Sequence, residues 1–392
     1  MTGLPLAGIT VVALEQAVAG PLATRHLADL GARVIKLERP GEGDFARDYD
    51  HAVNGLATHF VWLNRGKESF AVDLKTARGL RIARALIDRA DVFLHNTAPG
   101  VVERLGLDAD TLRAAHPGLV VVNLSGYGRG GPLERRKAYD MLIQAESGMV
   151  SVTGTPDTAT KTGVPNADIA AGLYSAMSVL AALVRRGVSG EGAVVDVSMF
   201  DSAVEWMGHP LYMQLYSGRS VPRMGLSHAA IAPYDAYPTA DGQVLIGVQN
   251  DRGWRALVRD VLDLAEYADD PRFATNVARV AHRAECDALV AGRTRRWATA
   301  DLDARLAAVG VAAAQVNTTA ELIEHPQLRE RDRWRTVATE AGPVRGVLPP
   351  MTFRDIELPM GPVPALGEHT QAILGELGLA PDAAEHQETT DV

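Results

Sequence analysis

Short aliphatic and β-branched runs alternate with helical patterns through the first half of the chain. The runs predicted as strands are "ITVVALE" (9–15), "RVIKLE" (33–38), "FAVDL" (70–74), "DVFLH" (91–95) and "LVVVNLS" (119–125). Helical patterns lie between them at 21–31, 76–89 and 108–115, the first with Pro21 near its start and Gly31 at its end. This β-α-β rhythm predicts an α/β fold with a mainly parallel, doubly wound sheet covered by helices. Ligands on such sheets bind beyond the carboxyl ends of the strands.

The length of 392 residues predicts more than one domain, because single cores seldom grow beyond about 250 to 300 residues. A Gly-, Ser-, Pro- and Arg-rich passage follows the strand predicted at 192–199 and a helical stretch that ends near 217. After it the pattern restarts, with a hairpin around Asp241-Gly242. We expect a large domain (1–217), a linker (218–228), a small α/β domain (229–328), a Pro-rich, irregular return to the large domain (329–380) and a flexible tail (381–392).

Composition narrows the class of protein. The net charge of −9 argues against a nucleic acid or an anionic membrane as the main partner. A single cysteine, Cys286, excludes a disulfide framework and favours a reducing cytoplasm, and the N-terminus has no export signal. The 11 histidines form no H-E-x-x-H motif, so no metal site is expected.

One carboxylate stands at the head of a long apolar run, "TGVPNADIAAGLYSAMSVLAALV" (162–184). The residues from Ile169 to Val184 are apolar or small on every face, which predicts a core helix buried all round rather than a membrane span. Asp168 occupies its first turn, where an acidic side chain is an ordinary stabiliser of a helix N-terminus. If that end is buried, however, the carboxylate has little water and needs hydrogen-bond donors to stay ionised.

Two other patterns suggest ligands. "GYGRGG" (126–131) contains G-x-G-x-x-G, but Pro132 follows instead of a helix, so a nicotinamide-dependent oxidoreductase has weak support. The basic residues Arg39, Lys75, Arg104 and Lys137 lie in presumed strand ends and loops. Singly they are typical of solvated surface charges, whereas together they would suit a ligand with several phosphates.

Seven blocks in order resemble the class III CoA-transferases, a group that includes formyl-CoA transferase and the carnitine CoA-transferases. They are "AGPLATRHLADLGARVIKLERPG", "NRGKESFAVDLKT", "ADVFLHNTAPGVVERLGL", "LSGYGRGGP", "KAYDMLIQAESGM", "PNADIAAGLYSAMSVLAALV" and "LGEHT". The resemblance implies a Rossmann-like large domain, a smaller inserted α/β domain and an interlocked homodimer. It also implies that the partners are an acyl-CoA, a small carboxylic acid and a second copy of the chain.

The resemblance assigns roles to individual positions. Asp168 matches the catalytic aspartate, and Tyr139 with Asp140 matches a tyrosine-acid pair of the family. The implied coenzyme A contacts are Arg39, Lys75, Asn96, Arg104 and Lys137. Formyl-CoA transferase has a glutamine where this chain has Val18, and its glycine-rich lid has no counterpart near 230–260. Both departures argue against formyl or oxalate as substrate.

The implied reaction passes through Asp168, first as a mixed anhydride and then as an aspartyl-CoA thioester, and it uses no metal and no nucleotide redox cofactor. N–H groups at the start of its helix would stabilise the oxyanion. Small dicarboxylic acids are the expected substrates, since the segment from Pro222 resembles branches that handle them. Arg223, His228 and Tyr234 would meet a distal carboxylate or, alternatively, hold the inter-domain linker.

Two further functions stay open at this point. An α-methylacyl-CoA racemase needs a histidine in a G-H-D setting, where this chain has Ala138-Tyr139-Asp140. A tyrosine with a pKa near 10 is a poor base for exchanging a proton near neutral pH. A non-catalytic CoA-binding paralogue is disfavoured by the presence of Asp168 together with the implied coenzyme A contacts.

Overall fold

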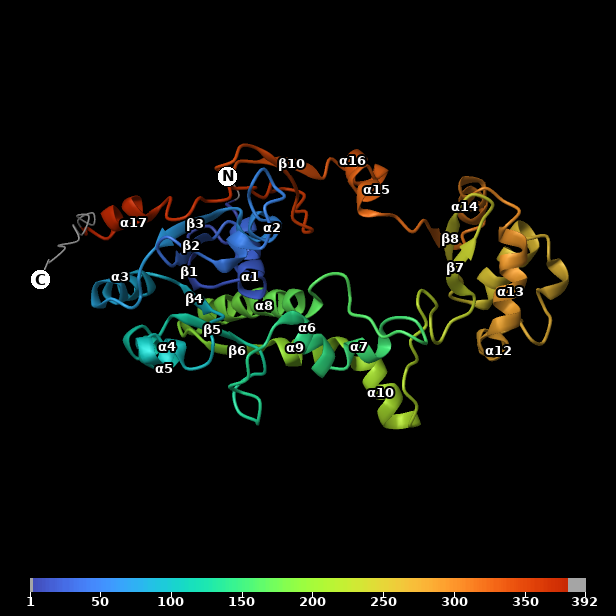
Figure 1. The fold of residues 1–392 in the computed structure, drawn as a ribbon, viewed down its shortest axis with the longest axis horizontal. Coiled ribbons are helices and arrows are strands. Elements are labelled where there is room, and N and C mark those ends of the chain that lie inside the picture. Colours follow the sequence, from blue (N-terminus) through green and yellow to red (C-terminus); the bar gives the residue numbers. More distant parts are fainter. Residues whose placement is uncertain (1–2, 380–392) are drawn as a thin grey trace, which may run out of the picture. The chain divides into compact units, whose positions relative to one another are not determined.

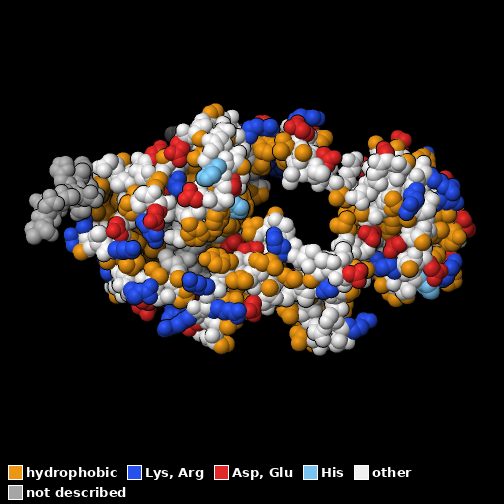
Figure 2. All heavy atoms as spheres, in the orientation of Figure 1, with side chains coloured by type: hydrophobic (Ala, Val, Ile, Leu, Met, Phe, Trp, Pro, Cys, Tyr) orange, Lys and Arg blue, Asp and Glu red, His pale blue; other side chains and the backbone are white. Residues whose placement is uncertain are grey.

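The computed structural model describes residues 3–379 (Figure 1). The chain divides into two compact units. Unit 1 comprises the described parts of Met1–Met149, Thr162–Gly208 and Asp332–Val392, and unit 2 comprises Val150–Lys161 and His209–Arg331. On the face drawn in Figure 2, lysines and arginines are interspersed with aspartates and glutamates. The tail predicted at 381–392 lies outside the described residues.

A six-stranded parallel sheet forms the centre of unit 1, as the alternating pattern predicts. Its strands are β1 (Thr10–Leu14), β2 (Arg33–Glu38), β3 (Lys67–Ala71), β4 (Val92–His95), β5 (Val120–Ser125) and β6 (Val194–Ser198). Their order is β3-β2-β1-β4-β5-β6, and every neighbouring pair is parallel. The order reverses between β1 and β4, so the loops after these strands lie where ligands bind such sheets.

Helices cover both faces of this sheet (Figure 1). One layer shares a core with Val12, Phe70 and Phe93 and consists of α3 (Ala77–Ile87), α4 (Val101–Leu105), α5 (Ala109–Ala115) and α17 (Thr370–Glu376). The other layer contains α1 (Ala19–Asp29), α2 (Thr58–Asn64) and α8 (Asn166–Ser189). The remaining elements of unit 1 include the 3-10 turn η1 (Phe45–Asp48), α6 (Asp140–Glu146), α9 (Met199–Trp206) and the hairpin β10 (Trp334–Val337) with β11 (Val344–Val347). A further helix, α7 (Met149–Val152), begins at the end of the first segment of unit 1.

Helices α1 and α8 pack closely because of Gly172. A Cβ atom at this position would lie 2.8 Å from the Ala19 carbonyl oxygen and 3.0 Å from Leu22. Since Gly172 stands one turn after Asp168, the close approach also brings the N-terminus of α1 to the N-terminus of α8.

The prediction that the apolar helix is buried all round is wrong for the chain by itself. Leu173, Met177, Val184 and Val188 form an exposed stripe along α8, at 43 to 90% of full exposure. Figure 2 shows apolar side chains over α8 and α6. The sequence records the apolar character of a face but not what covers it. By length and composition alone α8 is long enough to cross a membrane, yet its opposite face packs on α1 and the sheet.

Unit 2 has an antiparallel sheet of its own, in the order β7-β8-β9. The predicted hairpin around Asp241-Gly242 is present, with Pro238 opposite Gln243. Trp254, Phe273 and the unpaired thiol of Cys286 lie in its core. Its elements are α10 (Gly208–Ser217), β7 (Tyr234–Pro238), β8 (Gln243–Gly247), α11 (Asp251–Ala256), the π turn η2 (Leu257–Val261), η3 (Ala265–Tyr267), α12 (Asn276–Ala281), α13 (Arg283–Thr294), α14 (Thr299–Ala308), β9 (Ala312–Ala314), α15 (Thr319–Ile323) and α16 (Pro326–Glu330).

The segment after 330 is more regular than expected. It holds the β10–β11 hairpin and α17, both too short to leave a clear periodic pattern. The "LGEHT" block contacts β3, since the Gly367 N–H donates to Ser69 Oγ and the Ala71 N–H to Thr370 Oγ1.

Candidate active site

Asp168 is the third residue of α8 and is partly buried. The backbone N–H of Ala19, the first residue of α1, lies near its carboxyl group and favours the ionised form. Burial and the negative charge of Asp140 raise the pKa of Asp168 to about 7, although the Ala19 N–H acts in the opposite direction. Burial and the neighbouring charge therefore outweigh this one donor.

Asp140, the first residue of α6, caps the helix that carries Asp168. Its Oδ1 atom accepts hydrogen bonds from the N–H groups of Ala167 at 2.8 Å and Asp168 at 3.3 Å. Its Oδ2 atom accepts one from the side chain of fully buried Gln144 at 2.6 Å. The prediction that N–H groups at the start of this helix receive an oxyanion is wrong for these two donors, because Asp140 already occupies them.

The N-terminus of α1 supplies the donor instead. No side chain caps this helix, and the Leu22 N–H bonds back to the Val18 carbonyl. Pro21 has no N–H, so the uncapped donors of the first turn are those of Ala19 and Gly20. An uncapped helix N-terminus carries a partial positive charge that stabilises an anion placed before it.

A row of aromatic side chains begins beside Asp168. Burial and the charges of Asp44 and Asp168 raise the pKa of Tyr49 to about 12, so its hydroxyl stays protonated. The ring of Tyr49 lies 5.7 Å from that of Phe45 and 5.4 Å from that of His59, which in turn lies 6.3 Å from Trp62. Tyr139, the residue before Asp140, is exposed, at 62% of its full accessible surface. Sequence reasoning missed Tyr49, because no motif marks the loop after β2.

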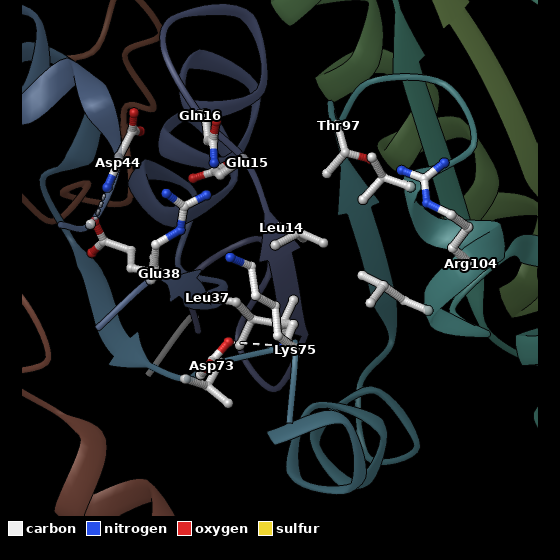
Figure 3. A pocket seen from close by; sticks show the side chains of 16 residues that line it. Leu14, Glu15, Gln16, Leu37, Glu38, Asp44, Asp73, Lys75, Thr97 and Arg104 are labelled. Carbon is white, nitrogen blue, oxygen red and sulfur yellow. Dashed lines mark hydrogen bonds between the residues drawn. The ribbon is translucent and has the colours of Figure 1, made fainter. Parts of the chain in front are cut away.

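A cavity of about 390 Å³ opens in unit 1 at the carboxyl ends of β1 to β4 (Figure 3). Arg39, Lys75 and Arg104 line it together with apolar side chains such as Leu14 and Leu37. The structure thus brings together three of the five residues predicted to contact coenzyme A. This combination of cations and apolar surface suits a planar base with attached phosphates.

The other two predicted contacts lie elsewhere. Lys137 is exposed in the loop before α6. Asn96 follows β4, and its amide bonds to both backbone groups of Gln16, at 2.9 and 2.8 Å. Neither residue lines the cavity within the described part of the chain.

Arg223, His228 and Tyr234 all lie in unit 2. The Arg223 guanidinium donates to the carbonyls of Thr155 and Pro156, at 3.1 and 3.0 Å. The rings of His228 and Tyr234 are stacked, with centroids 5.3 Å apart. These contacts hold the segment before β7 against other parts of unit 2. Across residues 3–379, no group of three His, Cys, Asp or Glu side chains is placed to hold a metal ion.

The chain is similar to known proteins along nearly its whole length. The model of CoA-transferase family III matches residues 6–370. A succinate–glutarate CoA-transferase of Agrobacterium fabrum is 37% identical over 383 residues, covering 95% of this chain and 96% of that protein. A succinyl-CoA–D-citramalate CoA-transferase of Chloroflexus aurantiacus is 33% identical over 389 residues, covering 96% and 95%.

A solved structure extends the likeness to three dimensions. A CaiB/BaiF family protein from Brucella suis superposes with a TM-score of 0.84 at 38% identity, covering 96% of this chain and all of that one. Both the sequence match and the fold span nearly the whole chain. The chain therefore belongs to CoA-transferase family III and is an enzyme that takes acyl-CoA as a substrate.

Proposed function

We propose that the protein moves coenzyme A between small dicarboxylic acids, with Asp168 as the nucleophile. The observation that carries this proposal is the partly buried carboxyl group of Asp168, with its raised pKa, at the uncapped N-terminus of α1. A carboxylate that is poorly solvated is a stronger nucleophile than one in bulk water, and a pKa near 7 leaves about half of it ionised at neutral pH.

The proposed reaction has four steps, and each is a nucleophilic attack on an acyl carbonyl. An oxygen of Asp168 attacks the thioester carbonyl, and the C–S bond breaks to give a mixed anhydride and coenzyme A thiolate. The thiolate attacks the aspartyl carbonyl, which releases the first acid and leaves an aspartyl-CoA thioester. The second acid attacks the aspartyl carbonyl of this thioester, and the C–S bond breaks to give a new anhydride and coenzyme A thiolate. The thiolate then attacks the acyl carbonyl of the anhydride, which forms the new acyl-CoA and frees Asp168.

Each step forms a tetrahedral oxyanion next to Asp168. The Ala19 N–H, which lies near the carboxylate in the resting enzyme, is proposed to donate to this oxygen when it belongs to the aspartyl group. Removal of one such donor in other enzymes slows catalysis about 10²- to 10³-fold. The α1 terminus therefore supports the negative charge first on the carboxylate and then on the oxyanion.

Coenzyme A is proposed to bind in the cavity lined by Arg39, Lys75 and Arg104. Lys137, exposed in the loop before α6 and outside the cavity lining, stays a candidate contact. The three lining cations suit the phosphates of coenzyme A, and the apolar wall suits its base. Because the thioester energy is kept in covalent intermediates, the proposed reaction needs no metal and no redox cofactor.

Dicarboxylates are favoured by the relatives, whose names specify succinate, glutarate and D-citramalate. Tyr49 and Tyr139 are candidates to contact the acyl group near Asp168. Arg223, His228 and Tyr234 remain candidates for the distal carboxylate, although the carbonyl contacts of Arg223 favour the alternative that this residue holds the linker.

The remaining features of the proposal concern assembly. We propose a homodimer, since the exposed stripe of α8 is an apolar surface that a second copy would cover. Unit 2 would serve as the smaller inserted domain. A reducing cytoplasm would suit the buried free thiol of Cys286.

The racemase alternative would need a free base beside Asp168, and Asp140 is not one. Three hydrogen bonds occupy its carboxylate, so it is a helix cap rather than a free base. Tyr139 is a poor substitute for the missing histidine.

Mass spectrometry tests the proposed function. Wild-type protein incubated with succinyl-CoA should carry a coenzyme A or succinyl adduct on Asp168, and Asp168→Asn should carry none and transfer at least about 10³-fold more slowly. Normal transfer by the variant without an adduct would refute the nucleophile. Exchange of the α-proton with deuterated solvent would instead support a racemase.

A further inference from the structure

We propose that Asn96 and Asp44 are positioning residues that clamp the Gln16–Ala19 turn from two sides and so aim the Ala19 N–H at Asp168. This inference rests on the proposed function, because it gives the turn a role in the transfer reaction. Neither side chain touches Asp168 in the described contacts, so each acts through the backbone between β1 and α1.

The turn has a conformation that the chain does not favour by itself. Ala17 has a φ of +63°, in the left-handed region that residues with a Cβ atom rarely adopt. Val18 follows with φ −121° and ψ −61°, and α1 begins at the next residue. Left-handed residues other than glycine cost about 1 kcal/mol or more and persist where surrounding contacts hold them.

Asn96 forms one side of the clamp. Its Oδ1 atom accepts the Gln16 N–H at 2.9 Å, and its Nδ2 atom donates to the Gln16 carbonyl at 2.8 Å. The amide thus pairs with Gln16 as a neighbouring strand would. A Cβ atom at Gly20 would lie 3.1 Å from Asn96 Cγ, so the side chain is packed against the first turn of α1 as well.

Asp44 forms the other side and is almost fully buried, at 1% exposure. Its Oδ1 atom accepts the N–H of Ala17 at 3.0 Å, and its Oδ2 atom accepts a hydrogen bond from Lys36 Nζ at 2.8 Å. A carboxylate bond to the N–H of the left-handed residue holds the peptide plane that sets the direction of the following N–H groups.

Lys36 fixes Asp44 in turn. Its side chain is fully buried, and its ammonium group also lies 3.5 Å from the Glu15 carboxylate. Burial would lower the pKa of Lys36, but Asp44, Glu15 and Glu38 outweigh it and raise the pKa, so the ammonium group stays charged. Breaking one partner of a buried ion pair leaves an unpaired charge, so the clamp is rigid and costly to distort.

The resemblance gives Asn96 another role, as a contact to coenzyme A, and the two roles have different kinetic signatures. A residue that contacts coenzyme A changes its dissociation constant. A residue that aims an oxyanion donor changes kcat and the rate at which Asp168 becomes acylated, while the dissociation constant stays the same. Thr97, the next residue, lines the cavity and is a matched comparison.

The experiment uses full-length Asn96→Asp, Asp44→Asn and Thr97→Val. Asn96→Asp keeps the acceptor for the Gln16 N–H but places a carboxylate against its carbonyl. We expect kcat and the rate of acylation by succinyl-CoA to fall about 10- to 100-fold, less than deletion of a donor would cause. The Kd for coenzyme A, measured by calorimetry, should change less than about twofold, as expected for a group that acts only in the transition state. Thr97→Val should instead weaken coenzyme A binding.

Asp44→Asn keeps an oxygen for the Ala17 N–H but turns an NH2 group toward Lys36 Nζ, and a fall in kcat of about five- to tenfold is expected. Because Asp44 also lines the cavity, Asn96→Asp alone carries the comparison of kcat with Kd. In both clamp variants, amide hydrogen exchange should accelerate at residues 16–19, and this readout does not depend on activity. A raised Kd with unchanged kcat in Asn96→Asp would overturn the clamp, as would unchanged exchange and kcat in both variants. If the wild type itself forms no Asp168 adduct, the proposed function fails, whereas the exchange measurement still tests the clamp geometry.

Discussion

Helices α1 and α8 begin at the same place, yet their N-termini are used in opposite ways. The first N–H groups of α8 are taken by the Asp140 carboxylate, whereas α1 has no side-chain cap and its first N–H contacts Asp168. A helix that bears a nucleophile need not be the helix that supplies the donors. Asp168 therefore lies beside one negative group, Asp140, and one partly positive helix end, that of α1. The first raises its pKa, and the second stabilises its ionised form.

The same difference has an energetic consequence. Asp140 stabilises the start of α8 but places a second carboxylate near Asp168, which together with burial makes ionisation of Asp168 unfavourable. Only the single N–H of Ala19 opposes these effects. The enzyme therefore gives up folding stability to maintain this carboxylate, as expected of a functional site.

The largest expected effect on stability comes from Asp168→Asn. The folded-state pKa of Asp168 is raised, to about 7, so between pH 4 and 7 the folded state binds a proton that the unfolded state has lost. Stability of the wild type therefore falls as pH rises through this window. Asn cannot ionise, so the variant should exceed the wild type by up to about 4 kcal/mol above pH 7 and by little at pH 4.

Urea unfolding at pH 4, 6 and 8 measures this difference. Asp88→Asn, at an exposed position after α3, is the control and should give the same difference at all three values. If Asp168→Asn is less stable than the wild type at pH 8, the ionised carboxylate does not destabilise the fold. The contrast between the two helix ends would then be wrong.

The next largest effect concerns the contact between the two helices. In Gly172→Ala the new Cβ atom would lie 2.8 Å from the Ala19 carbonyl, so α1 must move away from α8. We expect a stability loss of about 1 to 3 kcal/mol, as for other overpacked sites. Transfer should slow at least about tenfold, since the Ala19 N–H moves with its own carbonyl.

Gly187→Ala is the matched control on the same helix. A Cβ atom built there meets no atom within 4 Å apart from its own helix backbone and chain neighbours, so this variant should gain about 0.5 to 1 kcal/mol and retain full activity. Thermal melts and initial rates of both variants, compared side by side, test the prediction. Equal behaviour of the two variants would mean that close approach at Gly172 does not position Ala19.

The sheet was predictable from sequence, and the pairing of the helix ends was not. The alternating runs predict the six strands because a parallel strand buried on both faces is a nearly continuous aliphatic segment. The β3 strand begins three residues before its predicted run, because Lys67 and Ser69 are polar but buried and paired. Polar residues with buried partners hide a strand from a pattern based on hydrophobicity.

The active site was likewise predictable only in its local features. The position of Asp168 in the first turn was predictable, since an acid before an apolar run has a local signature. Its contacts are with Ala19 and Asp140, which are distant in sequence and lie near it only in the folded chain. The Asp44 and Asn96 clamp is invisible for the same reason, because its partners are backbone groups of residues 16 and 17 that any sequence possesses.

The smallest expected effect comes from Asp140→Asn, which sharpens the comparison by removing charge while leaving an acceptor. The amide oxygen can still accept the Ala167 and Asp168 N–H groups, although its NH2 group would face Gln144 and cost about 1 kcal/mol of stability. Without the charge of Asp140 the pKa of Asp168 should fall, so the acidic limb of kcat/KM, which we expect near pH 7 in the wild type, should move to lower pH. Rates measured from pH 5 to 9 give the position of this limb, and Asp88→Asn should leave it in place. An unmoved limb in Asp140→Asn would assign the raised pKa of Asp168 to burial alone, and the cap would then serve α8 without tuning the nucleophile.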